Sequence, residues 1–159
     1  MREMGIARQS LYDTFGDKRA LYLRALAQYR DNEHAKLRRL FASGRSVKEG
    51  FGRILLGISD ESREEHERGC LLLSANMERD AKDKVIAEFL LDNQLKTEAI
   101  FTDALRRAQA SGELSDKQDP TALARFFVAT IQGMRAMAKL NSNRQALEQV
   151  ARQALLTLV

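Results

Sequence analysis

Residues that could catalyse a reaction or bind a metal ion are sparse in this sequence. The chain contains one cysteine, Cys70, and two isolated histidines, His34 and His66. The run Glu64-Glu65-His66-Glu67 could contact a metal ion, but a run of this kind is more often a solvated charged surface. No nucleophile stands beside a base, and no carboxylates are paired in a pattern typical of acid–base catalysis. The sequence therefore predicts no enzyme, no metal site and no cofactor.

Cys70 could be a thiol that senses oxidation, but its apolar neighbours Leu71 to Leu73 favour a buried and inert side chain. A single cysteine cannot form an intramolecular disulfide, which is typical of proteins in a reducing compartment. The N-terminus lacks the basic and apolar segments of a signal peptide, and no stretch approaches the roughly 20 apolar residues of a membrane helix. We therefore expect a cytoplasmic protein that does not bind membranes.

Apolar residues recur at helical spacing along the 159-residue chain, which is long enough to bury a substantial core. Helix-forming residues abound, proline occurs once, and regularly spaced strand-and-turn signals are missing. We predict an all-α fold with helices near 7–14, 17–43, 46–58, 70–77, 85–110, 120–138 and 142–158. Residues 60–68 are expected to form a charged loop or a frayed helix end.

Four sites carry the signature of a helix start. Asp17 and Asp119 are suited to cap the helices that follow them, and Asp119 is followed by a proline at the first helical position. Ser46-x-x-Glu49 and Ser142-x-x-Gln145 have the pattern of capping boxes.

The helix expected at 17–43 changes character along its length. Its first part is apolar, its middle from Arg30 to Lys36 is polar on most sides, and Leu37, Leu40 and Phe41 restore an apolar face. A polar waist between two apolar ends indicates a helix that bridges two packed units.

The positive charge of the chain is concentrated at its N-terminus. Residues 1–45 carry 10 Lys and Arg against 5 Asp and Glu, a net +5, whereas residues 46–159 carry 16 against 17, a net −1. A basic segment of this kind could attract an anionic partner such as a phosphate backbone, or could equally be a solvated surface.

The stretch from Gly5 to Leu21 reads Gly-Ile-Ala-Arg-Gln-Ser-Leu-Tyr-Asp-Thr-Phe-Gly-Asp-Lys-Arg-Ala-Leu. This order resembles, without gaps, the recognition helix of the tetracycline-repressor-like (TetR/AcrR) transcriptional regulators and the start of their next helix. The resemblance implies that Arg8 and Gln9 reach base edges in the major groove, where Arg can pair with guanine and Gln with adenine. It also implies contacts with phosphates or bases from Tyr12 and Thr14, and with a phosphate from Lys18.

The first helix and most of the second helix of that family's DNA-binding domain have no counterpart in the sequence. We therefore expect a partial helix-turn-helix with its connecting helix in residues 1–43, and a ligand-binding and dimerisation domain in residues 44–159. Because a recognition helix needs its supporting helices, a polypeptide limited to these residues is expected to bind operator DNA poorly.

Two further segments extend the resemblance over the body of the chain, Arg68-Gly69-Cys70-Leu71-Leu72 and Ile131-Gln132-Gly133-Met134-Arg135. In the family, the last two helices form a four-helix interface between two copies. The resemblance implies that this interface contains Phe126, Thr130, Gly133, Met137, Leu147, Val150, Ala151, Ala154, Leu155 and Leu158. The alternative is that both apolar stripes pack only within one chain.

The family also holds a small-molecule effector among its middle helices. Candidates for this pocket are Phe51, Leu55, Met77, Phe89, Phe101, Phe127 and Met134, although each could simply pack in the core. The expected function is that of a homodimeric transcriptional regulator, most often a repressor, which an effector releases from operator DNA. The alternative is a dimeric helical protein that binds a small molecule and has no DNA-binding activity.

Overall fold

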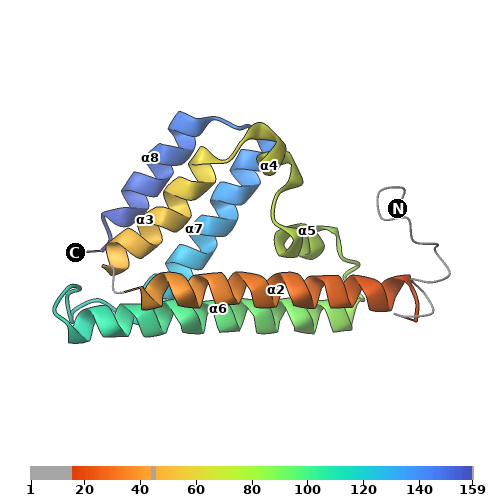
Figure 1. The fold of residues 1–159 in the computed structure, drawn as a ribbon, viewed down its shortest axis with the longest axis horizontal. Coiled ribbons are helices and arrows are strands. Elements are labelled where there is room, and N and C mark those ends of the chain that lie inside the picture. The colour runs from red at the N-terminus through yellow and green to blue at the C-terminus, as the bar shows by residue number, and fades with distance from the viewer. Residues whose placement is uncertain (1–15, 44–45, 159) are drawn as a thin grey trace.

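The computed structural model describes residues 16–43 and 46–158, which form seven α-helices and no β-strand (Figure 1). The helices are α2 (Lys18–Ala42), α3 (Val47–Asp60), α4 (Arg63–Arg68), α5 (Leu71–Glu78), α6 (Lys84–Ala110), α7 (Pro120–Leu140) and α8 (Arg144–Leu155). The predicted all-α fold is confirmed. The short helix predicted at 7–14 lies outside the described residues. In the part of the chain that the structure describes, no helix is both long and apolar enough to span a bilayer.

The long helices α2 and α6 lie side by side and run in the same direction (Figure 1). Asp17 caps α2 as predicted, because its side chain accepts a hydrogen bond from the Ala20 N–H at 2.7 Å. At the same end of the pair, Arg19 donates two hydrogen bonds, of 2.7 and 2.8 Å, to the carboxylate of Asp83. Asp83 also caps α6, since it accepts from the Ile86 N–H. This ion pair therefore joins the starts of both long helices.

A large hydrophobic core, here named the main core, is formed by α3, α7, α8 and the C-terminal half of α6. Phe51 stacks on Phe127 with ring centroids 3.9 Å apart, and Phe101 meets Phe51 edge-on at 5.0 Å. Phe41, near the end of α2, packs against both Phe51 and Phe101. Gly50 permits this approach, because a Cβ atom there would lie 2.6 Å from the Phe41 ring. The end of α2 is thereby anchored in the main core.

A second, smaller cluster, here named the α5 cluster, has as its buried members Leu26, Leu72, Ala75, Ile86 and Leu90. They come from α5 and from the N-terminal halves of α2 and α6, over which α5 lies in Figure 1. Helix α2 thus gives its first half to the α5 cluster and its last residues to the main core. Its polar middle lies between the two, in keeping with the predicted waist.

The caps predicted at Ser46 and Asp119 are confirmed. Ser46 accepts from the Glu49 N–H at 3.0 Å, and Asp119 accepts from the Thr121 N–H at 2.8 Å. The prediction of a loop at residues 60–68 is wrong over most of that segment, since α4 forms there. Ser62 and Glu65 make a complete capping box, in which each side chain accepts from the other residue's backbone N–H.

The start of α8 is also displaced from the prediction. Asn143, not Ser142, caps the helix, because its side chain accepts from the Ala146 N–H at 3.1 Å. The Ser142 hydroxyl instead donates to the carbonyl of Ala138 in the last turn of α7. The predicted motif was therefore one residue out of register.

Candidate functional site: a cavity between two hydrophobic clusters

A cavity of about 350 Å³ lies between the main core and the α5 cluster, with walls from α2, α3, α5, α6 and α7. Its apolar wall includes Leu37, Ile54, Leu72, Leu90, Phe101 and Val128. Its polar wall includes Tyr29, Glu33, His34, Asn93, Thr97 and Arg135. An apolar space with a few convergent polar groups is the usual form of a small-molecule site.

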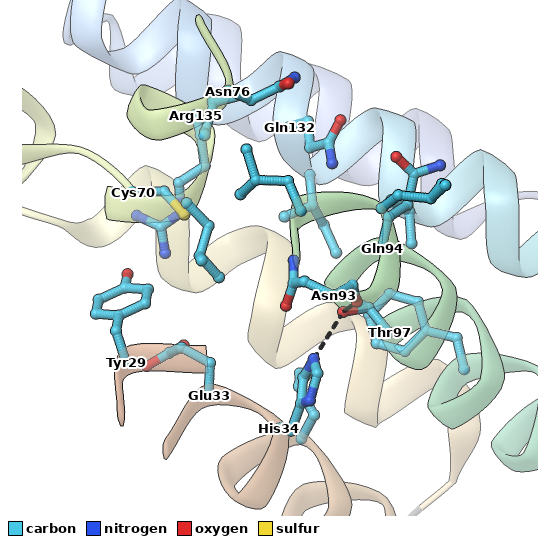
Figure 2. Close-up of a pocket in the computed structure, with 18 of the residues that line it drawn as sticks. Tyr29, Glu33, His34, Cys70, Asn76, Asn93, Gln94, Thr97, Gln132 and Arg135 are labelled. Carbon is cyan, nitrogen blue, oxygen red and sulfur yellow. Dashed lines mark hydrogen bonds between the residues drawn. The ribbon is translucent and has the colours of Figure 1, made fainter. Parts of the chain in front are cut away.

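Hydrogen bonds on one wall of the cavity fix the state of His34. The hydroxyl of Thr97 donates its only proton to the backbone carbonyl of Asn93 at 2.9 Å. Nε2 of His34 lies 3.1 Å from the same hydroxyl oxygen, so Nε2 carries the proton and donates (Figure 2). Burial, and then the charges of Arg38 and Arg30, lower the pKa of His34. The ring is therefore neutral at pH 7.

The side-chain oxygen of Asn93 is buried at this wall and has no partner in hydrogen-bond geometry. The Asn93 side chain is nevertheless close enough to His34 to oppose the lowering of the His34 pKa. In Figure 2 the Asn93 amide reaches toward the middle of the site. A buried acceptor without a partner costs roughly 1–3 kcal/mol. A bound molecule that donated a hydrogen bond to this oxygen would recover part of that free energy.

Another side of the cavity holds Tyr29, Cys70 and Arg135 (Figure 2). Burial raises the pKa of Tyr29 well above its usual range, and the neighbouring Cys70 and Glu33 raise it further, so Tyr29 keeps its O–H. Nη1 of Arg135 donates to both carboxylate oxygens of Glu61 at 2.7 Å. The charge of Arg135 is thus balanced by a residue at the end of α3. Cys70, expected to be buried, is half-buried in the wall.

Polar contacts tie α2 to α6 along the same region. The Arg30 guanidinium lies 4.7 Å from the centroid of the Phe89 ring and 3.4 Å from the Asp92 carboxylate. Nearer the start of both helices, Arg19 holds the pKa of Asp83 at about 2, so that carboxylate stays ionised at any physiological pH. These side chains supplement the small number of apolar contacts that hold the first half of α2.

Of the seven residues predicted for the ligand pocket, Phe101 lines this cavity. Four others are at most 1 % exposed and fill the main core: Phe51, Leu55, Phe127 and Met134. Phe89 packs against the α5 cluster beneath Arg30, and Met77 is 76 % exposed on α5. The large apolar residues therefore mark the packed interior more than the cavity.

The residues predicted for the dimer interface fall into two groups. Four lie on the outer side of α7: Phe126, Thr130, Gly133 and Met137. The six on or after α8 pack on the chain's own main core, where α8 lies against α3: Leu147, Val150, Ala151, Ala154, Leu155 and Leu158. Four of these side chains are buried within one chain and do not face a partner, which corrects the expectation for Leu147, Ala151, Ala154 and Leu158. Val150 and Leu155 are only partly buried, so their place in an interface stays a prediction.

Most residues predicted to contact DNA lie outside the described residues, namely Arg8, Gln9, Tyr12 and Thr14. Lys18 is the first residue of α2 and is exposed. The structure therefore bears on this set only through the position of α2, the helix that follows the predicted recognition helix.

The polar residues of the cavity were not predicted, although the sequence holds a signal for two of them. Asn93 and Thr97 are four residues apart and interrupt the apolar face of α6 that also carries Leu90 and Phe101. The two body segments named above, 68–72 and 131–135, both contribute residues to the cavity. No group of three or more side chains suited to a metal ion occurs among residues 16–43 and 46–158.

Comparisons with known proteins agree with this architecture. Residues 56–154 match the family described as "Tetracyclin repressor-like, C-terminal domain". The chain is 32 % identical over 151 residues to YezE of Bacillus subtilis (strain 168), an uncharacterised helix-turn-helix-type transcriptional regulator. That alignment covers 93 % of this chain and 77 % of the relative.

Two solved structures share the fold over nearly the whole chain. A cysteine mutant of the TetR family transcriptional regulator CifR, complexed with a 26-base-pair operator DNA, matches with a TM-score of 0.85 and 27 % identity, covering 99 % of this chain and 83 % of CifR. The regulatory protein TetR from Rhodobacter sphaeroides matches with a TM-score of 0.84 and 25 % identity, covering 97 % and 82 %. The sequence match and the shared arrangement of helices lead to one conclusion: the chain belongs to the TetR family of transcriptional regulators.

Proposed function

We propose that this protein is a repressor that a small-molecule effector releases from operator DNA, and that the effector binds in the cavity between the main core and the α5 cluster. The observation that carries the proposal is the position of α2. This helix lines the cavity through Tyr29 and His34, and its first residue, Lys18, comes soon after the helix predicted at 7–14, which resembles the recognition helix. Anything that changes the cavity is therefore coupled to the start of α2.

The two ends of α2 are held differently, which supports this coupling. Phe41 fixes the end of the helix in the main core, whereas Leu26 packs in the α5 cluster on the other side of the cavity. An effector that binds more tightly to one arrangement of the two clusters shifts the protein toward it, by as much as its affinities differ. In a dimer, this shift changes the distance between the DNA-binding regions of the two copies. Residues 1–43 would then form the DNA-binding region with its connecting helix, and residues 44–159 the effector-binding and dimerisation domain.

The proposed dimer uses the outer face of α7. Phe126 is 40 % exposed and Met137 is 43 % exposed, and Gly133 lies between them with no atom within 4 Å of the position a Cβ would take. A face of small and apolar residues allows close approach of a second helix. We place this regulator in the cytoplasm, where its operator would be.

The effector site can be tested by filling the cavity. Ala87 lines the cavity on α6, so Ala87→Phe should occupy it, whereas Ala110→Phe makes the same exchange at the far, exposed end of α6. An operator is first selected from random DNA, using the chain with a complete helix-turn-helix added before Met1. We expect Ala87→Phe to weaken operator binding at least about fivefold, the lower range of allosteric coupling, and Ala110→Phe to leave it unchanged. A folded Ala87→Phe protein with unchanged operator affinity would contradict the proposed site.

We also propose that a polypeptide limited to these 159 residues binds operator weakly. A recognition helix is held in place by the helices that precede it in the DNA-binding domain. A salt titration of operator affinity, with and without the added helices, tests this. Equal affinities and salt slopes would refute it. Failure of both forms to select any DNA would favour a small-molecule-binding protein without DNA-binding activity.

A further inference from the structure

The chemistry of the cavity wall restricts what the effector can be. Three charged side chains line the cavity, and each has a polar partner. Glu33 accepts from Lys36 at 2.6 Å, Arg135 is held by Glu61, and Arg79 donates to Asn76 at 3.4 Å. A cationic ligand would compete with Lys36 for Glu33, and an anionic ligand would compete with Glu61 for Arg135. The partner of Arg79 is a neutral amide.

Added positive charge is disfavoured on the α2 side of the cavity. Burial, and then the charges of Arg38 and Arg30, lower the pKa of His34, so a proton on the imidazole is opposed there. A ligand ammonium group beside His34 would meet the same opposition.

One hydrogen-bonding atom of this wall is buried without a partner. The proton of Thr97 goes to a backbone carbonyl and the Nε2 proton of His34 goes to Thr97, so neither side chain has a proton to spare for a ligand. The group left without a partner is the buried acceptor Oδ1 of Asn93. This atom therefore favours a ligand that donates a hydrogen bond to it.

We infer that the effector is an uncharged molecule with an apolar body and an N–H or O–H group, such as a phenol, an alcohol or a carboxamide, and that Asn93 Oδ1 accepts its hydrogen bond. The apolar body would lie against Leu72, Phe101 and Val128, which come from both sides of the cavity. This inference rests on the proposed function, because it concerns the same cavity.

Four matched probes test the inference on the full chain: phenol, anisole, benzoate and benzylammonium. Anisole replaces the O–H of phenol with a methoxy group, and the other two probes carry opposite charges. Binding is followed by NMR of the Val128 methyl groups, which line the cavity in every variant, and in chains that keep Asn93 also of its side-chain amide. Because one hydrogen bond contributes about 0.5–1.5 kcal/mol net, phenol should bind roughly two- to tenfold more tightly than anisole. Both charged probes should bind more weakly than phenol.

Two variants separate the hydrogen bond from general packing. Asn93→Leu should abolish the preference for phenol over anisole while anisole still binds, whereas Asn32→Leu, the same exchange on the exposed side of α2, should keep that preference. Glu61→Gln removes the carboxylate that balances Arg135 and should improve benzoate binding.

Three results would overturn the inference: a phenol preference that survives in Asn93→Leu, a charged probe that binds most tightly to the unmodified chain, or no probe that shifts the Asn93 amide at millimolar concentration. Operator affinity is measured separately with the same probes. If phenol binds at Asn93 and operator affinity does not change, the proposed release mechanism fails while the assignment of ligand chemistry stands.

Discussion

The main core and the α5 cluster differ in how they are held together. Among the described residues, the main core contains 19 buried apolar residues and the α5 cluster contains five. The main core includes three fully buried phenylalanines in ring contact, whereas the α5 cluster relies on partly buried residues and on ion pairs at its edge. Local stability follows buried apolar contact, so the α5 cluster is the part of the molecule that can open or shift at low cost.

The difference explains why the cavity lies where it does. A cavity inside the main core would cost free energy through lost packing, whereas a cavity at the boundary separates two units that need not fit tightly. The Arg19 side chain of the Arg19–Asp83 ion pair is 52 % exposed, so water can solvate its guanidinium when the two units shift. A ligand at this boundary can therefore change the relation between the two units without unfolding either.

The largest effect is expected in the main core. Phe51→Ala removes a fully buried ring that contacts Phe41, Phe101 and Phe127, and it should lower the free energy of unfolding by about 3–5 kcal/mol. Urea denaturation followed by circular dichroism measures this. A loss below about 1 kcal/mol would mean that the main core is not the stabilising unit.

A smaller global effect is expected in the α5 cluster. Leu72 lines the cavity and is 9 % exposed. Leu72→Ala should therefore lower the free energy of unfolding by about 2 kcal/mol or less, the lower end of the range for Leu→Ala exchanges in cores. The same variant should accelerate hydrogen exchange in α5 more than in α3. If Leu72→Ala destabilised the protein as much as Phe51→Ala, the two units would unfold as one.

The anchor of α2 can be weakened at a single glycine. Gly50→Ala places a Cβ against the Phe41 ring and should destabilise by about 1–3 kcal/mol, because the ring or the helix must shift. Gly57, on the exposed side of the same helix, is the matched control, since a Cβ there meets no atom within 4 Å. Gly57→Ala should stabilise by up to about 1 kcal/mol through helix propensity. Thermal denaturation of both variants tests this. Equal changes in Tm for Gly50→Ala and Gly57→Ala would show that the contact between Gly50 and Phe41 does not limit the side chain at position 50.

The smallest predicted effect is a pH dependence from His34. Its pKa in the folded state lies below the ordinary value of 6.5, so the unfolded chain binds a proton more readily than the folded protein does. The stability that depends on neutral His34 is present above pH 6.5 and is lost as the pH falls below it. His34→Gln keeps an N–H donor for Thr97 and should flatten this part of the stability profile. A profile that is identical in the variant would show that His34 does not contribute.

The sequence predicted six of the seven described helices and the family because their signals are local, whereas α4 was expected to be a loop or a frayed helix end. Asp17, Ser46 and Asp119 could be recognised as caps from the residues beside them. The cavity could not be recognised in this way, because its polar groups come from helices that meet only in the fold. His34 and Thr97, for example, are 63 residues apart. Large apolar residues such as Phe51 and Met134 were poor guides, since residues of that type fill cores more often than they line pockets.

The most direct test of the account is native-state hydrogen exchange on the full chain, comparing amides of α5 with amides of α3. We predict that the amides of α5, such as that of Ala75, exchange through a local opening whose free energy is clearly below that of global unfolding, whereas the amide of Leu55 in α3 exchanges only through global unfolding. Equal opening free energies at the two positions would contradict the claim that the cavity separates a rigid core from a movable cluster.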